Sequence, residues 1–136
     1  MLPACASPDG TKRGRIDAHV HVWTPDTKAY PLAEGAAKKG MKPASFTPEE
    51  LFAECKPQGV DRVVLIQMSF YKYDNRYMLD MMEKHRGVFG GVAIVDENLP
   101  DVCATMKTLA RRGVRGFRIY TSRAQAEAWG EGMNKM

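Results

Sequence analysis

Two histidines and an aspartate alternate with apolar residues in one short stretch of this chain. The stretch runs from residue 15 to residue 23, and Asp17, His19 and His21 are its polar members after Arg15. Side chains two apart on a β-strand project from one face, so the pattern predicts a strand that aims three polar groups into the protein interior. A buried polar group costs about 1–3 kcal/mol unless it is hydrogen-bonded or bound to metal. The two imidazoles therefore predict either a shared metal ion or a hydrogen-bonded polar pair in a core.

Three further side chains stand near the ends of predicted strands. The guanidinium of Arg118 suits bidentate binding of a substrate carboxylate, and a salt bridge to an acidic neighbour is the alternative. Gln67 and Ser69 could hydrogen-bond a substrate or simply satisfy loop backbone. The remaining histidine, His85, ends a predicted helix and is expected to interact with the carbonyls there.

Predicted strands and helices alternate along the chain. Strands are predicted at residues 15–23, 60–67, 88–95 and 114–120, and helices from Thr47 to about Cys55 and at residues 74–85, 99–112 and 123–136. Thr47, Pro48 and Glu50 form the pattern of a capping box with proline at the first helical position. A long irregular segment, residues 24–46, follows the first strand. The regular alternation predicts an α/β fold with right-handed βαβ units and a parallel sheet.

The length of the chain limits how much of a barrel it can form. A complete (β/α)8 (TIM) barrel needs about 250 residues, and this chain has 136. Four βα units therefore correspond to the first half of a TIM barrel. We expect residues 1–14 to be a flexible lead-in and residues 15–136 to be a partial barrel domain. In a parallel barrel the chemistry lies at the carboxyl ends of the strands, where His19 and His21 are predicted to be.

The composition excludes several other classes of protein. Hydrophobic residues make up 44% and charged residues 26%, values typical of a globular domain. The basic residues are scattered rather than clustered, which argues against nucleic-acid binding, and no apolar run is long enough to span a membrane. The three cysteines show no CxxC spacing, which predicts reduced thiols in a cytoplasmic protein. Cys55 and Cys103 are expected to be buried or partly buried on helices.

Five motifs in order along the chain resemble those of the amidohydrolase-related TIM-barrel hydrolases. They are IDAHVHVW at residues 16–23 with Tyr-Pro at 30–31, GVDRVVLIQ at 59–67, DNRYML at 74–79, GGVA at 90–93 and RGVRGFR at 112–118. The resemblance is strongest to the branch that contains sugar lactonases and pyrone-dicarboxylate lactonases, and it covers residues 15–120. Five motifs in register on four βα units are much more specific than an HxH pair alone.

The resemblance assigns roles to individual residues. It implies that His19 and His21 ligate a divalent metal ion, zinc or manganese, or hydrogen-bond the substrate carbonyl in members that work without metal. It implies that Arg118 faces the substrate. The general base of such enzymes comes from a later strand, so we expect no catalytic base before Met136. The bridging lysine of binuclear members is missing from the fourth strand, so any metal site is expected to be mononuclear.

These inferences lead to one principal expectation and two alternatives. We expect the N-terminal half of a hydrolase that cleaves a lactone or a related C–O or C–N bond, with a small-molecule substrate such as a carboxylated lactone. A decarboxylase of the same superfamily is the first alternative, and a non-catalytic α/β domain is the second. By itself the chain is expected to lack efficient turnover. Its two open sheet edges are expected to favour association with a second copy or with a C-terminal half.

Overall fold

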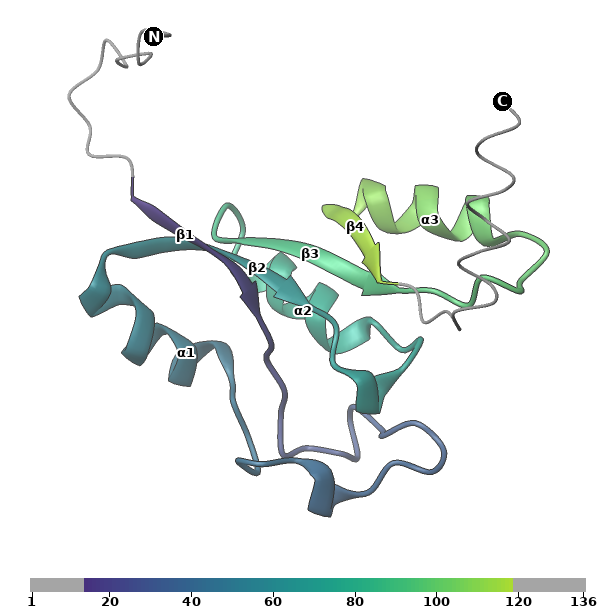
Figure 1. Cartoon of the computed structure of the whole chain (residues 1–136), viewed down its shortest axis with the longest axis horizontal. Coiled ribbons are helices and arrows are strands. Elements are labelled where there is room, and N and C mark those ends of the chain that lie inside the picture. The colour runs from purple at the N-terminus through teal and green to yellow at the C-terminus, as the bar shows by residue number, and fades with distance from the viewer. Residues whose placement is uncertain (1–13, 119–136) are drawn as a thin grey trace, which may run out of the picture.

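A single parallel sheet organises the part of the chain that is described, residues 14–118 of the computed structural model. Its strands are β1 (Arg15–Val20), β2 (Val60–Ile66), β3 (Phe89–Ile94) and β4 (Val114–Arg118). Neighbouring strands pair in parallel in the order β1-β2-β3-β4, as Figure 1 shows. Four consecutive parallel strands joined through helices confirm the predicted α/β class and are the arrangement expected of the first half of a TIM barrel.

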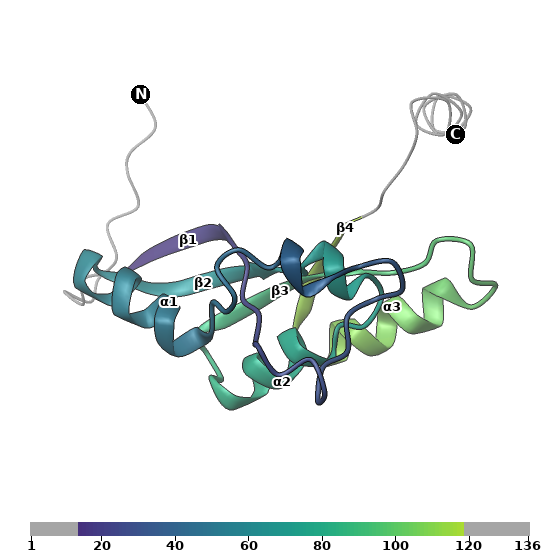
Figure 2. The same ribbon diagram turned by 90° about the horizontal axis from the view of Figure 1, so that it is seen from below.

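Three α-helices cover one face of the sheet. They are α1 (Pro48–Cys55), α2 (Arg76–Lys84) and α3 (Val102–Arg111), and three 3-10 turns accompany them, η1 (Lys38–Gly40), η2 (Lys56–Gln58) and η3 (Ser69–Tyr71). Figure 2 shows α1, α2 and α3 in one layer beneath the strands. Each helix buries an apolar stripe against the same side of the sheet, which leaves the other side without a covering helix in the described part of the chain.

The core lies between the helices and the sheet. Leu65 and Ala93 are completely inaccessible to solvent, and Met78 and Met82 of α2 are buried in the same core cluster. Gly91 of β3 allows this close packing, because a Cβ atom there would lie 2.6 Å from the Met82 sulfur. Packing against the helices therefore fixes the strands, and the strands in turn position the residues at their carboxyl ends.

The start of α1 confirms the predicted capping box. The Glu50 amide donates to the Thr47 hydroxyl at 3.3 Å, and the Glu50 carboxylate accepts from the Thr47 amide at 2.6 Å. Pro48 occupies the first helical position. The helix continues into η2, and Gly59 closes that turn with φ of 73°, a backbone conformation that favours glycine.

The first strand is shorter than predicted. β1 ends at Val20, and Trp23 instead forms an isolated antiparallel bridge with Phe46 at the far end of the long loop. The Trp23 amide donates to the Phe46 carbonyl at 2.9 Å, and the indole Nε1 donates to the Pro43 carbonyl at 3.0 Å. These bonds join the two ends of the long loop, residues 24–46, beside the sheet.

Two predictions about burial are wrong. Asp17 and His19 are exposed and His21 is half-buried, whereas all three were predicted to point into the interior. β1 is an edge strand of a sheet whose helices, within residues 14–118, lie on one face only. Cys103 is exposed although Cys55 is buried, because Val102 and Met106 form the packed side of α3 and Cys103 lies just off that stripe.

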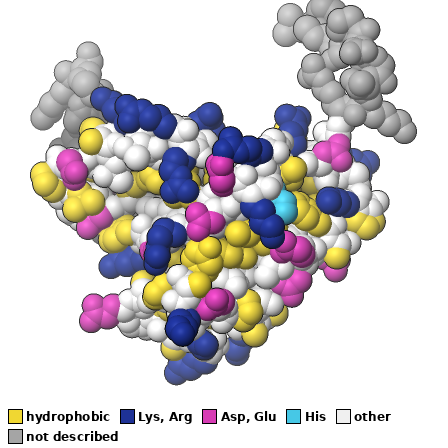
Figure 3. Space-filling view, turned by 180° about the vertical axis from the view of Figure 1, so that it is seen from behind, with side chains coloured by type: hydrophobic (Ala, Val, Ile, Leu, Met, Phe, Trp, Pro, Cys, Tyr) yellow, Lys and Arg dark blue, Asp and Glu magenta, His cyan; other side chains and the backbone are white. Residues whose placement is uncertain are grey.

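Two predicted segments lie outside the described residues: nearly all of the lead-in, residues 1–14, and the last helix, residues 123–136. Within residues 14–118, no helix is both long enough and apolar enough to cross a membrane. The face opposite to that of Figure 1 carries Lys and Arg side chains interspersed with Asp, Glu and hydrophobic ones, as Figure 3 shows.

Candidate functional site

The two histidines of the HxH motif lie side by side at the carboxyl end of β1. Their ring centroids are 5.1 Å apart, and the rings meet edge to face at 83°. His19 is the second-to-last residue of β1, and His21 directly follows Val20, the last residue of the strand. The structure thus brings together the two residues that the sequence selected as metal ligands.

A backbone carbonyl of the neighbouring strand fixes the orientation of His21. The Nδ1 atom of His21 lies 2.7 Å from the carbonyl oxygen of Ile66, the last residue of β2. A carbonyl can only accept a hydrogen bond, so Nδ1 carries the proton. In the neutral ring Nε2 is then left with a lone pair, which is the state in which an imidazole binds a metal ion.

Asp17 has a local structural role in the same strand. Its Oδ1 atom accepts a hydrogen bond from the His19 amide at 3.0 Å. The contact orders the backbone directly before the two imidazoles, and it engages one oxygen of the carboxylate. Asp17 therefore stabilises the backbone conformation at the end of β1, where the two histidines lie.

A hollow opens beside the histidine pair. It has a volume of about 410 Å³ and is lined by His19, Val20, His21, Trp23, Pro43 and Phe46. The Trp23 and Phe46 rings lie 5.6 Å apart, and Phe70 of η3 approaches the indole edge-on at 6.1 Å. The two imidazoles thus face a hollow whose other walls are apolar and aromatic.

Tyr71 is a buried phenol near this hollow that the sequence did not single out. Its hydroxyl accepts a hydrogen bond from the Thr24 amide at 3.3 Å, and only 2% of the residue is exposed. Burial raises the pKa of Tyr71 above its ordinary value, so the phenol keeps its proton at neutral pH. It joins η3 to the first residues of the long loop behind the hollow.

The three predicted substrate-binding residues have different surroundings. Gln67 is 2% exposed, and its Nε2 donates to the Asp74 carbonyl at 2.6 Å, so this donor satisfies loop backbone, as one of the two readings predicted. Ser69 is exposed at the start of η3. Arg118 is half-buried at the end of β4 and pairs in register with Ile94, on the sheet edge opposite to the one that β1 forms.

The donor set for a metal ion is partial. Among residues 14–118, no group of three or more His, Cys, Asp or Glu side chains is close enough to hold a metal ion. His19 and His21 could supply two nitrogen ligands, whereas a catalytic zinc site takes three protein ligands and a water. The chemistry of the two imidazoles fits zinc or manganese as part of a ligand set that other groups complete.

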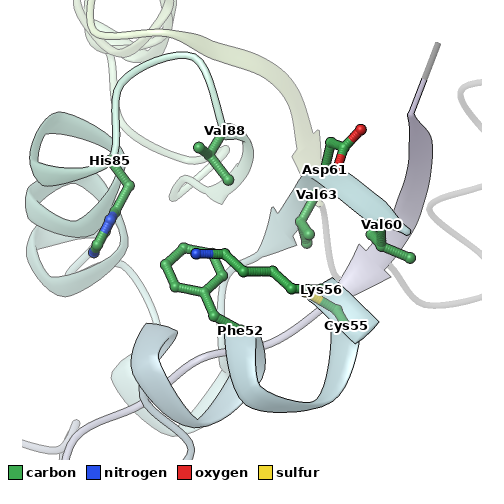
Figure 4. Close-up of a pocket in the computed structure, with 8 residues that line it drawn as sticks. All are labelled: Phe52, Cys55, Lys56, Val60, Asp61, Val63, His85 and Val88. Atoms are coloured by element: carbon green, nitrogen blue, oxygen red, sulfur yellow. The ribbon is translucent and has the colours of Figure 1, made fainter. Parts of the chain in front are cut away.

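A second hollow lies at the amino ends of the strands. It has a volume of about 360 Å³ and is lined by Phe52, Cys55, Lys56, Val60, Asp61, Val63, His85 and Val88, which Figure 4 shows. The Lys56 ammonium lies 4.3 Å from the centre of the Phe52 ring. The ring of His85, predicted to contact helix carbonyls, packs edge-on against Phe52 and Phe89, and its Nε2 is buried without a hydrogen-bond partner among the described residues.

Comparison with protein families and curated proteins gives consistent results. Residues 16–134 match the family model described as "Amidohydrolase". The chain is 32% identical over 106 residues to a 2-pyrone-4,6-dicarboxylate hydrolase of Comamonas testosteroni, and 31% identical over 113 residues to an L-fucono-1,5-lactonase of Burkholderia ambifaria. These matches cover 78% and 74% of this chain but 33% and 36% of the relatives. The chain therefore spans about a third of the length of the curated relatives it matches.

Solved structures share the arrangement of the strands and helices. A crystal structure from Agrobacterium tumefaciens matches with a TM-score of 0.65 and 27% identity, over 79% of this chain and 37% of that one. A Pseudomonas putida protein, provisionally identified as a 2-pyrone-4,6-dicarboxylic acid hydrolase, matches with a TM-score of 0.63 and 27% identity, over 78% of this chain and 36% of that one. Both likenesses place the four strands in the first part of a longer chain.

Proposed function

Because the chain belongs to the amidohydrolase family, we propose that it supplies the first strands of the active site of a hydrolase. The reaction is the cleavage of a lactone, or of a related C–O or C–N bond, by polarisation of the carbonyl and attack by water. Hydrolysis of a lactone is also what the names of both curated relatives suggest for those proteins. Two imidazoles at the end of the first strand are the residues on which this proposal depends.

The hydrogen bond between His21 and the Ile66 carbonyl is the observation that carries the proposal. With the proton on Nδ1, the neutral His21 ring presents Nε2 as an acceptor rather than as a donor. An acceptor nitrogen binds a metal ion but cannot donate to a substrate carbonyl. This tautomer therefore favours the metal-dependent alternative over the one in which histidine hydrogen-bonds the substrate directly.

A divalent metal ion held by His19 and His21 would act as a Lewis acid toward a carbonyl oxygen. The chain's own contribution is to hold two imidazoles 5.1 Å apart, with one ring fixed by a strand carbonyl, beside a hollow of substrate size. The His19 ring packs edge to face against the His21 ring. His21 is thus oriented before a metal ion arrives.

The walls of the hollow suggest how a substrate is held. Trp23, Pro43 and Phe46 form an apolar surface next to the imidazoles, on which the flat side of a ring can lie. Arg118, at the end of β4, is proposed to bind a carboxylate of the substrate, and Ser69 to hydrogen-bond it. A small lactone that carries a carboxylate combines these features.

The remaining parts of the active site are proposed to come from other strands. The chain spans about a third of the relatives' length, and we assign the general base and the further metal ligands to the portion that corresponds to their other two thirds. On this proposal residues 1–136 alone have no efficient turnover. They regain it when a segment that supplies the later strands closes the sheet.

Titration of the purified chain with zinc, followed by calorimetry, tests the proposal. We expect one zinc ion per chain or per assembly, and we expect His19→Ala and His21→Ala to abolish binding. His85→Phe is the matched control, because it removes the third histidine from the opposite end of the sheet and should leave zinc binding unchanged. Equal zinc affinity in the wild type and both alanine variants would show that the HxH pair is not the metal site.

A further inference from the structure

Two buried amide side chains join the carboxyl ends of β2 and β3. Gln67 is 2% exposed and Asn75 is 7% exposed, and they are the buried polar residues of the part of the chain that is described. A buried amide that lacks partners is costly, so each amide is expected to be hydrogen-bonded. Both are bonded, and all of their bonds reach backbone atoms near the end of the sheet.

Gln67 is held at both its backbone and its side chain. Its amide N–H donates to the Val92 carbonyl of β3 at 2.9 Å, and its side-chain Nε2 donates to the Asp74 carbonyl at 2.6 Å. Gln67 directly follows Ile66, whose carbonyl accepts the proton of His21 Nδ1. The peptide unit between Ile66 and Gln67 therefore has one side bonded to the active-site histidine and the other side bonded to β3.

Asn75 fixes the segment on which Gln67 depends. Its Oδ1 accepts from the Ile94 amide at 3.0 Å, and its Nδ2 donates to the Ile94 carbonyl at 2.8 Å and to the Tyr73 carbonyl at 3.0 Å. Both backbone groups of Ile94 are bonded to one side chain, as they would be by a further strand. Asp74, the acceptor of the Gln67 bond, is the preceding residue and is held in place with it.

We propose that Gln67 and Asn75 are positioning residues for the histidine pair. Together they form a clamp, which holds the Ile66 carbonyl where it keeps the proton of His21 on Nδ1 and leaves Nε2 available to a ligand. Gln67 thus acts through His21 and not by touching the substrate. The role of the clamp in metal binding rests on the proposed function, whereas its effect on the His21 tautomer does not.

Nitrogen NMR of the imidazoles tests the clamp without any metal ion. In the wild-type chain His21 is expected to show one tautomer, protonated at Nδ1. In Gln67→Met, which keeps the length of the side chain but removes its donor, we expect the signals to move toward a mixture of the two tautomers. Gln58→Met makes the same change at an exposed glutamine of η2 and should leave the His21 signals unchanged.

Zinc titration of the same variants gives a second reading. Loss of a group that orients a metal ligand typically weakens metal binding by about 10–100-fold, and we expect about tenfold for Gln67→Met because Gln67 acts one step further away. If Gln67→Met does not fold, Gln67→Asn replaces it, since its shorter amide does not reach the Asp74 carbonyl. The tautomer should shift in that variant as well.

The outcomes separate the clamp from the proposed function. An unchanged tautomer in a folded Gln67 variant would overturn the clamp, whether or not zinc binds. A shifted tautomer in a chain that binds no zinc would uphold the clamp and remove the metal-dependent part of the proposed function. A shifted tautomer together with weaker zinc binding supports both.

Discussion

The two ends of the sheet each have a hollow with histidine in it, yet they are built differently. At the carboxyl ends His19 and His21 lie together, and a strand carbonyl holds a ring nitrogen of His21 at 2.7 Å. At the amino ends the His85 ring packs against two phenylalanine rings, and its Nε2 lies 4.0 Å from a carboxylate oxygen of the exposed Glu49. A histidine in a hollow is therefore not by itself evidence of a site.

The difference lies in how the polar atoms are satisfied. At the carboxyl ends the buried amides of Gln67 and Asn75 are bonded to backbone, and His19 and His21 line a hollow. At the amino ends the Nε2 of His85 is buried without a hydrogen-bond partner in residues 14–118. The polar groups at the carboxyl ends are oriented by hydrogen bonds, whereas the ring of His85 contributes mainly apolar contact area to the packing of α1 and α2 on β3.

The largest effect is expected at the carboxyl ends, from Asn75→Leu. The substitution leaves the amide and the carbonyl of Ile94 without their partner, and an unsatisfied buried group costs about 1–3 kcal/mol, so the free energy of unfolding should fall by about 3 kcal/mol. Urea unfolding followed by circular dichroism measures this. Asn98→Leu, at an exposed loop amide, should change it by less than about 0.5 kcal/mol. Similar losses in the two variants would contradict the claim that the buried hydrogen bonds of Asn75 stabilise the carboxyl ends of the strands.

A smaller effect of opposite sign is expected at the amino ends, from His85→Phe. A phenyl ring keeps the contacts with Phe52 and Phe89 and removes the unpaired nitrogen, so the free energy of unfolding should rise by about 1 kcal/mol or less. Urea unfolding of the wild type and the variant at pH 8 measures this change. The lost contact with Glu49 counts for little, since that carboxylate side chain is 58% exposed. A fall of more than 1 kcal/mol would mean that Nε2 has a partner in solution and that the two ends are more alike than they look.

The sequence predicted the features that depend on local periodicity. The alternation around Asp17, His19 and His21 placed two imidazoles at a strand end, and the spacing of Thr47 and Glu50 placed the start of α1. Both depend on contacts between residues two or three apart, and such contacts follow from strand or helix geometry alone. The repeated strand and helix pattern likewise predicted the parallel sheet.

The sequence did not predict the features that depend on distant contacts. Asn75 looked like an ordinary residue of a helix predicted at residues 74–85, but its partner Ile94 is 19 residues away on the next strand. Trp23 was predicted to be the last residue of the first strand, but in the structure it forms a bridge with Phe46. Their partners are set by how the loops fold onto the sheet, and no local pattern encodes that. An asparagine at the start of a predicted helix is the signal that could have drawn attention to Asn75.

The smallest effect concerns two ion pairs, one between Asp74 and Arg76 at the start of α2 and one between α1 and α2. Asp74 accepts hydrogen bonds from the Arg76 guanidinium at 2.7–3.1 Å, and these bonds hold the pKa of Asp74 below its ordinary value. Glu49 accepts from Lys84 at 2.7 Å, which likewise lowers the pKa of Glu49. A carboxyl group whose pKa is lowered by folding contributes stability above its unfolded pKa, and that contribution disappears as the pH falls through its folded pKa.

Carbon NMR of the carboxyl groups during acid titration measures both pairs. In Arg76→Gln the pKa of Asp74 should rise toward its ordinary value but stay somewhat below it, because the backbone amide of residue 76 still donates to the carboxylate. In Lys84→Gln the pKa of Glu49 should rise and that of Asp74 should not move. The Asp74 carbonyl also receives the Gln67 bond, so a displaced Asp74 backbone in Arg76→Gln would move the His21 signals as well. Unmoved His21 signals would show that the clamp depends on buried amides alone, and that the exposed ion pair beside it adds only a dependence on pH.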